Sequence, residues 1–543
     1  MWLIPGLSNQ LAVSLQSPAM PQPKFYNFAV DLLERSLAGG RAGKVAYIDP
    51  DRQLTYGELH DLACRSARLL CSLGIRREER IAMIMLDTVD WPCIFLGAVM
   101  AGIIPVPLNT SLTNDTYTYA LADSRAKVVV VSASLLDAIQ PVLTDLTDLE
   151  SIIITGGAAP KGNIDFAQAV RAESSQFDCA RTHPDEPAFW LYSSGSTGPP
   201  KGVKHVHSSP LETAKLYGAN VLGMREDDVC LSAAKLFFAY GLGNALFFPL
   251  AAGATAVLNP SRPSPQLMFH FLKTYQPTLF FGVPTLYAAM LGDPGLVNEF
   301  GSPRLRLCVS AGEALPEHLG HKWKQRFGVD ILDGVGSTEL LHIFLSNSPG
   351  DVVYGTSGKA VPGYELRLVD EKNVTLGPGE IGELLVRAPS SAEGYWNQRR
   401  KTQATFEGEW SRTGDKFTRD AEGRYRYCGR ADDMFKVSGQ WVSPAEVESA
   451  LISNNDVLEA AVIPAMDADK LIKPKAFVVV KPTADRDAIE DRLKAQVKAH
   501  LEPWKYPRWI QIVDALPKTA TGKIQRFKLR ECEPSTTPGV EPD

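Results

Sequence analysis

The sequence predicts an α/β fold in which parallel α/β layers form a large N-terminal domain, followed by a small barrel-like β unit and a small α+β C-terminal domain. Three observations predict this class: the length of the chain, the alternation of short apolar runs with helical stretches, and a change of pattern near residue 350. A chain of 543 residues is too long for one hydrophobic core and suggests about three or four folding units.

The first half of the chain carries the signals of buried parallel strands and their helices. Thr55 and Glu58 form a capping box, leucines recur at helical spacing after them, and Gly74 ends the predicted helix. The runs "RIAMIML", "KVVVVS", "SIIIT" and "TLFFGVPT" predict strands, and "WPCIFLGAVMAG" is typical of an intervening helix. Continuous apolar strands between helices favour a parallel sheet that is covered on both faces.

The pattern changes in the last third of the chain. Residues 351–387 contain hairpin turns and alternating strands, which predict the antiparallel or barrel-like unit. Further on, the strands "AAVIPA" and "KAFVVV" and the charged helix "DRDAIEDRLKAQVKAHL" predict the α+β domain. We therefore divide the chain into a disordered extension (1–24), an N-terminal domain (25–431) and a C-terminal domain (432–543).

Composition excludes several classes of partner. The formal net charge of −6 offers no electrostatic reason to bind nucleic acid or an anionic membrane surface. No apolar run reaches the roughly 18 residues of a membrane span, and the apolar start lacks a Lys or Arg before Lys24, unlike a signal peptide. The eight cysteines form no C-x-x-C pair, so neither zinc nor a disulfide framework is indicated. We expect a cytoplasmic protein.

The stretch "YSSGSTGPPKGVKH" (192–205) indicates a phosphate-binding loop. Glycines and small hydroxyl residues let backbone N–H groups wrap a polyphosphate, and Lys201 adds a point charge. A Walker loop is excluded because Pro200 and Gly202 flank the lysine. A flexible linker is disfavoured because the stretch follows the apolar run "AFWLY" and contains Pro-Pro-Lys.

Five further motifs follow this loop in order: "SAGEALP" (310–316), "DGVGSTE" (333–339), "SRTGDKF" (411–417), "GRADDMFKVSGQWVSPAEVE" (429–448) and "PKTATGK" (517–523). Together they resemble the signature motifs of the adenylate-forming superfamily, which includes acyl-CoA synthetases, luciferases and peptide-synthetase adenylation domains. The resemblance implies that a carboxylate attacks the α-phosphate of ATP, with Mg²⁺ as cofactor, and that the acyl group then passes to the thiol of coenzyme A.

The resemblance also implies roles for individual residues of the ATP site. The β- and γ-phosphates would be held by Ser193, Ser194, Gly195, Ser196, Thr197, Gly198 and Lys201. Thr338 and Glu339 would contact the α-phosphate and Mg²⁺, for which a carboxylate is a suitable hard ligand. Adenine would lie between Gly312, Glu313 and Ala314 on one side and Asp333, Gly334 and Val335 on the other. Asp415 would accept hydrogen bonds from the ribose hydroxyls, and Arg430 would add a further contact.

The end of the chain matches the mobile part of the family. By resemblance, Lys523 reaches the reacting carboxylate and the α-phosphate, where its charge stabilises the transition state. Asp432 occupies the hinge about which the C-terminal domain swings between the two half-reactions. Ser438 and Gly439 correspond to the lining of the pantetheine tunnel. A further hypothesis is that a lysine acetyltransferase switches the enzyme off by removing the charge of Lys523.

Two segments resemble the acyl pocket, "KLFFAYGLGNALFF" and "GVGSTELLHIF". Aromatic walls with small floor residues favour a flat slot for a ring. The walls would be Phe238 and Tyr240, the floor Ala239, Gly241 and Gly336, and the closing residues His342 and Ile343. With "GKAVPGY", these segments look most similar to benzoate-CoA ligases and their hydroxy- and aminobenzoate relatives.

Several alternatives stay open at this stage. The favoured substrate is benzoate or a substituted benzoate, with 4-hydroxybenzoate and 2-aminobenzoate as alternatives. Amino-acid activation is disfavoured because Phe238 leaves an ammonium group unpaired, and because only 20 residues follow Lys523, too few for a carrier domain. A luciferase-like oxygenase and a non-catalytic acyl-adenylate-binding regulator are remoter. His205 and His207 lack a third ligand with plausible spacing, which argues against a metal site. A homodimer is left open.

Overall fold

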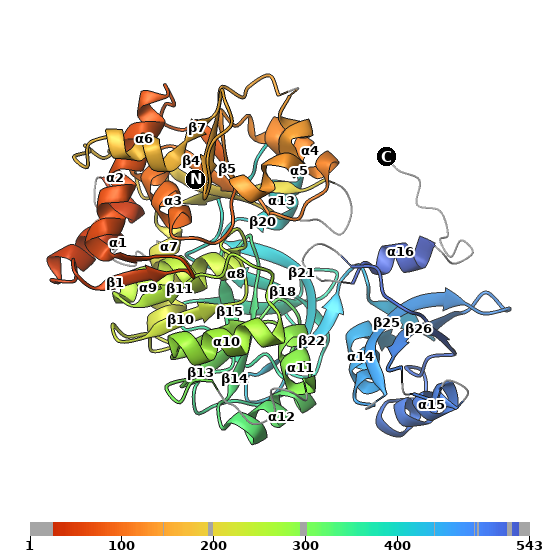
Figure 1. Cartoon of the computed structure of the whole chain (residues 1–543). Helices are drawn as coiled ribbons and strands as arrows, with labels where there is room; N and C mark the ends of the chain where they lie inside the picture. The colour runs from red at the N-terminus through yellow and green to blue at the C-terminus, as the bar shows by residue number, and fades with distance from the viewer. Residues whose placement is uncertain are drawn as a thin grey trace, which may run out of the picture.

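The computed structural model of the chain describes residues 25–144, 146–193, 199–293, 301–438, 440–454, 456–482, 484–485, 488–518 and 524–531. The predicted disordered extension, residues 1–24, lies outside them. Figure 1 shows a large N-terminal body, coloured from red to teal, and a smaller blue unit beside it that is formed by the end of the chain. The predicted α/β class is confirmed.

A parallel five-stranded sheet forms the first layer, in the order β4-β3-β5-β6-β7. Its strands are β3 (Arg80–Ile84), β4 (Ile104–Pro107), β5 (Val128–Ser132), β6 (Ser151–Thr155) and β7 (Ile164–Asp165). The helices of this region are α1 (Phe28–Ala38), α2 (Tyr56–Ser72), α3 (Asp90–Met100), α4 (Asn114–Ser124), α5 (Leu136–Leu143) and α6 (Phe166–Ala172). The capping box of Thr55 and Glu58 begins α2 as predicted, and every residue of β5 is buried, as expected for a strand covered on both faces.

A nine-stranded sheet forms the second layer, in the order β16-β15-β14-β13-β12-β10-β11-β1-β2. Its strands are β1 (Val45–Ile48), β2 (Gln53–Thr55), β10 (Val229–Ser232), β11 (Thr255–Val257), β12 (Leu279–Gly282), β13 (Leu307–Ser310), β14 (Ile331–Gly336), β15 (Ile343–Ser346) and β16 (Lys359–Ala360). The helices are α7 (Ser209–Thr213), η2 (Ala214–Ala219), α8 (Ala239–Leu242), η3 (Gly243–Phe247), α9 (Phe248–Ala252), α10 (Pro265–Tyr275), α11 (Pro284–Gly292) and α12 (Glu317–Phe327).

The central strands of this second sheet run parallel, and their carboxyl ends lie side by side. Gly282 pairs with Ser310, and Ser310 pairs with Asp333. The carboxyl edge of parallel strands is where α/β folds bind ligands. Residues 311–316 follow β13 and residues 337–342 follow β14, which places two of the motif segments next to each other.

A small antiparallel sheet carries the phosphate loop. Strand β8 (Pro187–Ser193) pairs with β9 (Lys201–Val206), and β9 pairs on its other side with β19 (Gly394–Tyr395). Ser193 lies opposite Lys201 in this register, so the two ends of the predicted phosphate loop stand side by side. The long-range pair β9–β19 brings residues near 395 to the base of the loop.

The predicted barrel-like unit is a second antiparallel sheet. Its strands are β17 (Glu365–Val369), β18 (Gly382–Arg387), β20 (Phe406–Glu407), β21 (Trp410–Arg419) and β22 (Tyr425–Arg430), with helix α13 (Arg399–Thr405) beside them. Asp415 on β21 lies directly opposite Arg430 on β22.

The C-terminal unit is α+β, as predicted. It contains β23 (Phe435–Val437), β24 (Gln440–Val442), α14 (Pro444–Ile452), β25 (Val457–Met466), β26 (Ile472–Val480), α15 (Ile489–His500), β27 (Trp509–Ile512) and α16 (Arg526–Glu531). Strands β25, β26 and β27 form one sheet, and a separate apolar cluster centred on Val442, Val462 and Val478 is its core. The domain boundary at residue 432 stays a prediction.

Candidate active site

The base of the phosphate loop is closed by a cluster of three side chains from three separate parts of the chain. The Lys201 ammonium lies 3.8 Å from Glu339 Oε1 and donates a hydrogen bond of 3.2 Å to the Tyr395 hydroxyl. That hydroxyl donates to Glu339 Oε1 over 2.9 Å, and Ser193 Oγ donates to the same oxygen over 3.4 Å. Burial lowers the pKa of Lys201, while the charge of Glu339 acts in the opposite direction.

Ser193, Lys201 and Glu339 were expected at the site, and Tyr395 was not. Lys201 and Glu339 come from the two predicted phosphate motifs, and the structure brings them together. Tyr395 lies in "AEGYWNQ", which has no local pattern that marks a binding residue. The signal lies in the β9–β19 pairing, where Tyr395 stands opposite Val203, and a single sequence does not reveal such a long-range pair.

The rest of the predicted phosphate loop, Ser194, Gly195, Ser196, Thr197 and Gly198, lies outside the described residues. So do Lys523 and Gly439. Their assigned roles stay predictions from the sequence.

The two predicted adenine segments meet at the carboxyl edge of the large sheet. Gly312, Glu313 and Ala314 are exposed after β13, whereas Asp333 on β14 is buried. The Asp333 carboxylate accepts hydrogen bonds from the Leu315 N–H over 3.3 Å and from Ser357 Oγ over 3.1 Å. Burial raises the pKa of Asp333 to about 7. This side chain therefore ties the two segments to each other.

Gly334, Val335 and Gly336 continue β14 toward the edge of the sheet. A side chain at Gly334 would collide with Ile343, and one at Gly336 would collide with the His342 carbonyl group. The segment after β14 therefore doubles back closely on the start of β15.

The predicted ribose contacts form a cross-strand ion pair. Arg430 Nη1 donates to Asp415 Oδ1 over 3.1 Å and to the Thr413 carbonyl over 2.9 Å. The guanidinium lies close to Gly414, which has a φ of 69°. A Cβ added at Gly414 would lie 2.9 Å from Arg430 Nη2. The glycine thus allows both the turn and the approach of Arg430.

The predicted acid pocket has a core of packed rings. His342 is buried, its ring centroid lies 5.6 Å from Tyr240 and 4.5 Å from Phe248, and its Nε2 lies 3.2 Å from the Tyr240 carbonyl and 3.1 Å from Asn244 Oδ1. Burial lowers its pKa to about 3, so the ring is neutral near pH 7. Phe238 is half-buried and precedes α8.

Of the small residues expected to form the pocket floor, Ala239 begins α8 and is half-buried, and Gly336 is exposed. At Gly241 an added Cβ would lie 2.1 Å from the Lys235 carbonyl oxygen, and its place on the pocket floor stays a prediction. The missing side chain at Gly241 is therefore needed for a close turn of the chain. Ile343 is buried against Gly334.

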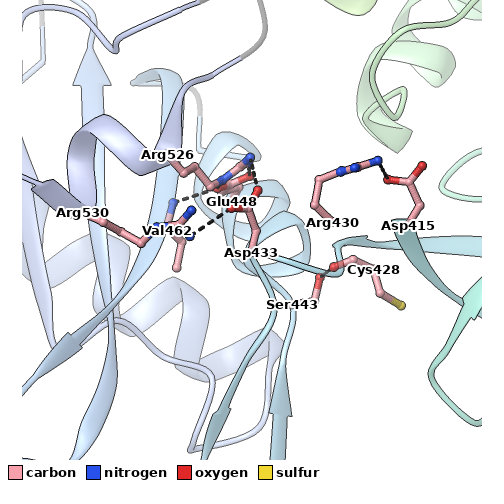
Figure 2. Close-up of polar contacts among 9 residues, drawn as sticks. All are labelled: Asp415, Cys428, Arg430, Asp433, Ser443, Glu448, Val462, Arg526 and Arg530. Carbon is pink, nitrogen blue, oxygen red and sulfur yellow. Dashed lines mark hydrogen bonds and ion pairs between the residues drawn. The ribbon is translucent and has the colours of Figure 1, made fainter. Parts of the chain in front are cut away.

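The linker between the two units is held at both ends (Figure 2). On one side, Arg430 binds Asp415 as described. On the other, Asp433 accepts hydrogen bonds from Arg530 Nη1 over 3.0 Å and from Arg526 Nη1 over 3.4 Å, both on α16. The predicted hinge residue Asp432 is exposed and lies between these two anchors.

The second anchor continues into the core of the C-terminal unit. Arg526 binds the nearly buried Glu448 of α14 through two hydrogen bonds of 3.0 and 2.6 Å, and Glu448 Oε1 also accepts from the Val462 N–H over 2.7 Å. Ser443 Oγ donates to the Cys428 carbonyl and so links the start of α14 to β22. Ser438, a predicted tunnel residue, has a φ of 50° at the turn between β23 and β24.

The two histidines considered as a metal pair have other partners. His205 Nε2 lies 2.9 Å from the Thr338 carbonyl, and His207 Nδ1 accepts from the Phe28 N–H over 3.4 Å. The described part of the chain holds no group of three or more His, Cys, Asp or Glu side chains suited to a metal ion. Among its helices, none is both long and apolar enough to cross a bilayer.

The chain matches two models of known protein families. Residues 33–396 match the model of the AMP-binding enzyme family, and residues 446–523 match that of the AMP-binding enzyme C-terminal domain. The chain therefore belongs to the AMP-binding enzyme family.

Three similar proteins of this family are CoA ligases of aromatic acids. The chain is 56% identical over 518 residues to a 4-hydroxybenzoate-CoA/benzoate-CoA ligase of Rhodopseudomonas palustris, covering 95% of each protein. It is 56% identical to a benzoate-CoA ligase of Thauera aromatica, covering 94% of this chain and 97% of the relative. The solved structure of the anthranilate CoA ligase AuaEII in complex with anthranoyl-AMP superposes with a TM-score of 0.90 at 44% identity, covering 94% and 97% of the two chains.

Proposed function

We propose that this chain ligates an aromatic carboxylic acid, benzoate or a substituted benzoate, to coenzyme A through an acyl-adenylate, with release of AMP and pyrophosphate. One observation carries the proposal. The segment from Gly336 to Ile343 presents Glu339 to Lys201 at the phosphate loop and His342 to Tyr240 in the ring-lined pocket. A nucleotide and an aromatic acid bound at the two ends of this segment would be neighbours.

The electrostatics of the site suit adenylate formation. The attacking carboxylate and the triphosphate are both anionic, so their approach needs cations. Lys201 supplies one fixed charge. Glu339 is the carboxylate that would hold Mg²⁺, and the Ser193 hydroxyl lies beside it. Bound Mg²⁺ would neutralise phosphate charge. Tyr395 orients the Glu339 carboxylate.

The ligand roles assigned from the sequence belong to the same proposal. Asp415 and Arg430 form an ion pair at which ribose hydroxyls would find an acceptor and a donor. Asp333 holds the segment 311–315 against β14, which supports an adenine site between Gly312 and Gly334.

The linker geometry supports the proposed hinge. Arg430 is bound to the N-terminal domain and Asp433 to α16, so a rotation of the C-terminal domain would be concentrated in the residues between them. We place the hinge at Asp432 on this ground. The rotation would take the proposed catalytic Lys523 out of the active site and bring the proposed tunnel residues Ser438 and Gly439 into it. Acetylation of Lys523, a homodimer and a cytoplasmic location stay predictions of the sequence.

The substrate alternatives are 4-hydroxybenzoate and 2-aminobenzoate. The printed names of the Rhodopseudomonas palustris relative and of AuaEII support them. The Tyr240 hydroxyl is engaged with the protein itself, since it donates toward the Val309 and Gly282 carbonyls at 3.2 and 3.4 Å. The buried His342 Nδ1, by contrast, has no hydrogen-bond partner among the described residues. A ring hydroxyl or amino group would have to compete for the Tyr240 hydroxyl, whereas His342 Nδ1 offers it an acceptor. Both substituted acids therefore stay alternatives to benzoate.

The test is a benzoate-dependent reaction of the purified full-length protein with ATP, Mg²⁺ and coenzyme A. We expect AMP, pyrophosphate and benzoyl-CoA in equal amounts, and benzoyl-AMP when coenzyme A is omitted. Light emission with O₂ in place of thioester formation would favour the oxygenase alternative. Binding of benzoyl-AMP with no turnover would favour the regulator.

A further inference from the structure

Three consecutive carbonyl groups of the segment that bears Glu339 are held by three separate donors. The Thr338 carbonyl lies 2.9 Å from His205 Nε2, the Glu339 carbonyl accepts from the Ala392 N–H over 2.8 Å, and the Leu340 carbonyl accepts from Ser390 Oγ over 2.8 Å. The segment is not a strand or a helix at this point. Within it, the Thr338 and Leu340 carbonyls also accept from the Leu341 and His342 N–H groups over 3.2 and 2.9 Å, so the three bonds fasten a local turn to the residues packed against it.

The His205 imidazole is held in one orientation. Its ring stacks on Phe189, its partner in the β8–β9 register, with the centroids 5.1 Å apart and the planes at 21°. A carbonyl oxygen only accepts, so Nε2 must carry the proton and donate it to Thr338. Burial lowers the pKa of His205 to about 4, which keeps the ring neutral and this tautomer available.

The same geometry has a cost. With the proton on Nε2, the buried Nδ1 is an acceptor, and among the described residues it has no hydrogen-bond partner. A buried acceptor without a partner destabilises the fold, and an apolar ring of similar size would avoid the loss. Packing alone therefore does not account for a histidine here, whereas the bond to Thr338 does.

We infer that His205 is a positioning residue for the adenylation step. Its hydrogen bond fixes the position of the Thr338-Glu339 peptide relative to Lys201. Lys201 and His205 are four residues apart on β9, so their side chains point to the same face of the strand. Strand β9 thus carries the Lys201 cation and, through His205, also holds the backbone next to the Glu339 carboxylate. The inference rests on the proposed function, because it takes Glu339 as the residue for Mg²⁺.

Four variants test this inference. His205→Phe keeps the ring and removes the donor, His205→Gln keeps an N–H donor at nearly the distance of Nε2, and His205→Asn has its donor one bond too short. His207→Phe is the matched control, since His207 follows the same strand, is equally buried and bonds to Phe28 instead. For each, benzoate-dependent pyrophosphate release is measured against MgATP and free Mg²⁺, together with the melting temperature.

We expect His205→Phe and His205→Asn to lower kcat/KM for MgATP by about 10-fold or more and to raise the Mg²⁺ requirement, as a misplaced catalytic group would. His205→Gln should recover activity to within about threefold of the wild type, as should His207→Phe. The comparison of Gln with Asn holds even where the Phe variant does not fold. Equal activity of His205→Gln and His205→Asn, or an unchanged Mg²⁺ requirement in all variants, would overturn the inference. A wild-type chain without benzoate-dependent pyrophosphate release would overturn the proposed function as well.

Discussion

Replacing Tyr395 by phenylalanine removes a single hydroxyl from the cluster at the base of the phosphate loop. This hydroxyl donates to Glu339 Oε1 over 2.9 Å and accepts from Lys201 Nζ over 3.2 Å. The ring stays, because it is buried and packs under the Lys201 ammonium, which lies 4.4 Å from its centroid. The variant therefore separates the hydrogen bonds from the packing.

The size of the effect follows from the two bonds. A hydrogen bond to a charged group contributes about 1.5 to 3 kcal/mol, and Lys201 and Glu339 are each only 19% exposed, so solvent screens them little. A loss of about 2 kcal/mol in the transition state corresponds to about a 30-fold lower kcat/KM for MgATP. The assay is steady-state pyrophosphate release with benzoate at saturation.

Tyr354→Phe is the matched control, because the Tyr354 hydroxyl donates to Asp330 Oδ1 over 3.1 Å at the other end of β14. This variant should lose stability yet keep kcat/KM to within about twofold of the wild type, since its bond lies outside the reaction site. Wild-type kcat/KM for Tyr395→Phe, with the Mg²⁺ dependence unchanged, would refute the role given to the cluster.

Three further predictions concern the ends of the reaction and the pH dependence of stability. Lys523→Ala should abolish benzoyl-AMP formation but leave thioester formation from supplied benzoyl-AMP. Equal loss of both steps would contradict the role of Lys523 in adenylation. Asp432→Pro should release pyrophosphate normally yet fail to transfer the acyl group, since proline restricts the backbone between the two anchors; unimpaired transfer would exclude the hinge. The folded chain keeps the Asp333 proton up to about pH 7, whereas the unfolded chain loses it near pH 4, so the unfolding free energy falls as the pH rises through this window. The unfolding free energy of Asp333→Asn, measured with urea, should therefore rise relative to that of the wild type by up to about 4 kcal/mol between pH 4 and pH 8. A difference between the two proteins that does not change with pH would contradict a buried, protonated Asp333.

Local signals predicted the elements of the fold well. The capping box of Thr55 and Glu58 begins α2, and the continuous apolar run of β5 is buried on both faces. Both signals act over a few residues, so they can be read from one sequence. The apolar run "AFWLY" before the phosphate motif, read as a strand, is part of β8.

Contacts between distant segments could not be predicted in this way. Tyr395 reaches Glu339 only through the β9–β19 pair, and Arg526 reaches Asp433 across the whole C-terminal unit. His205 was weighed as a metal ligand, but the structure gives it the Thr338 carbonyl. The close approach of the Lys235 carbonyl to Gly241 likewise could not be read from the sequence. In each case the deciding partner is far away in the sequence or is a backbone atom, which leaves no trace in residue type.

The most direct test of the account is a competition among acids. The purified protein is incubated with ATP, Mg²⁺, coenzyme A and equimolar benzoate, 4-hydroxybenzoate, 2-aminobenzoate, cinnamate and medium-chain fatty acids, and the thioesters are quantified by mass spectrometry. The account predicts that benzoyl-CoA dominates, because the proposed acid pocket is built from the packed rings around His342. Predominance of fatty acyl or cinnamoyl thioesters, or AMP release without any thioester, would contradict it.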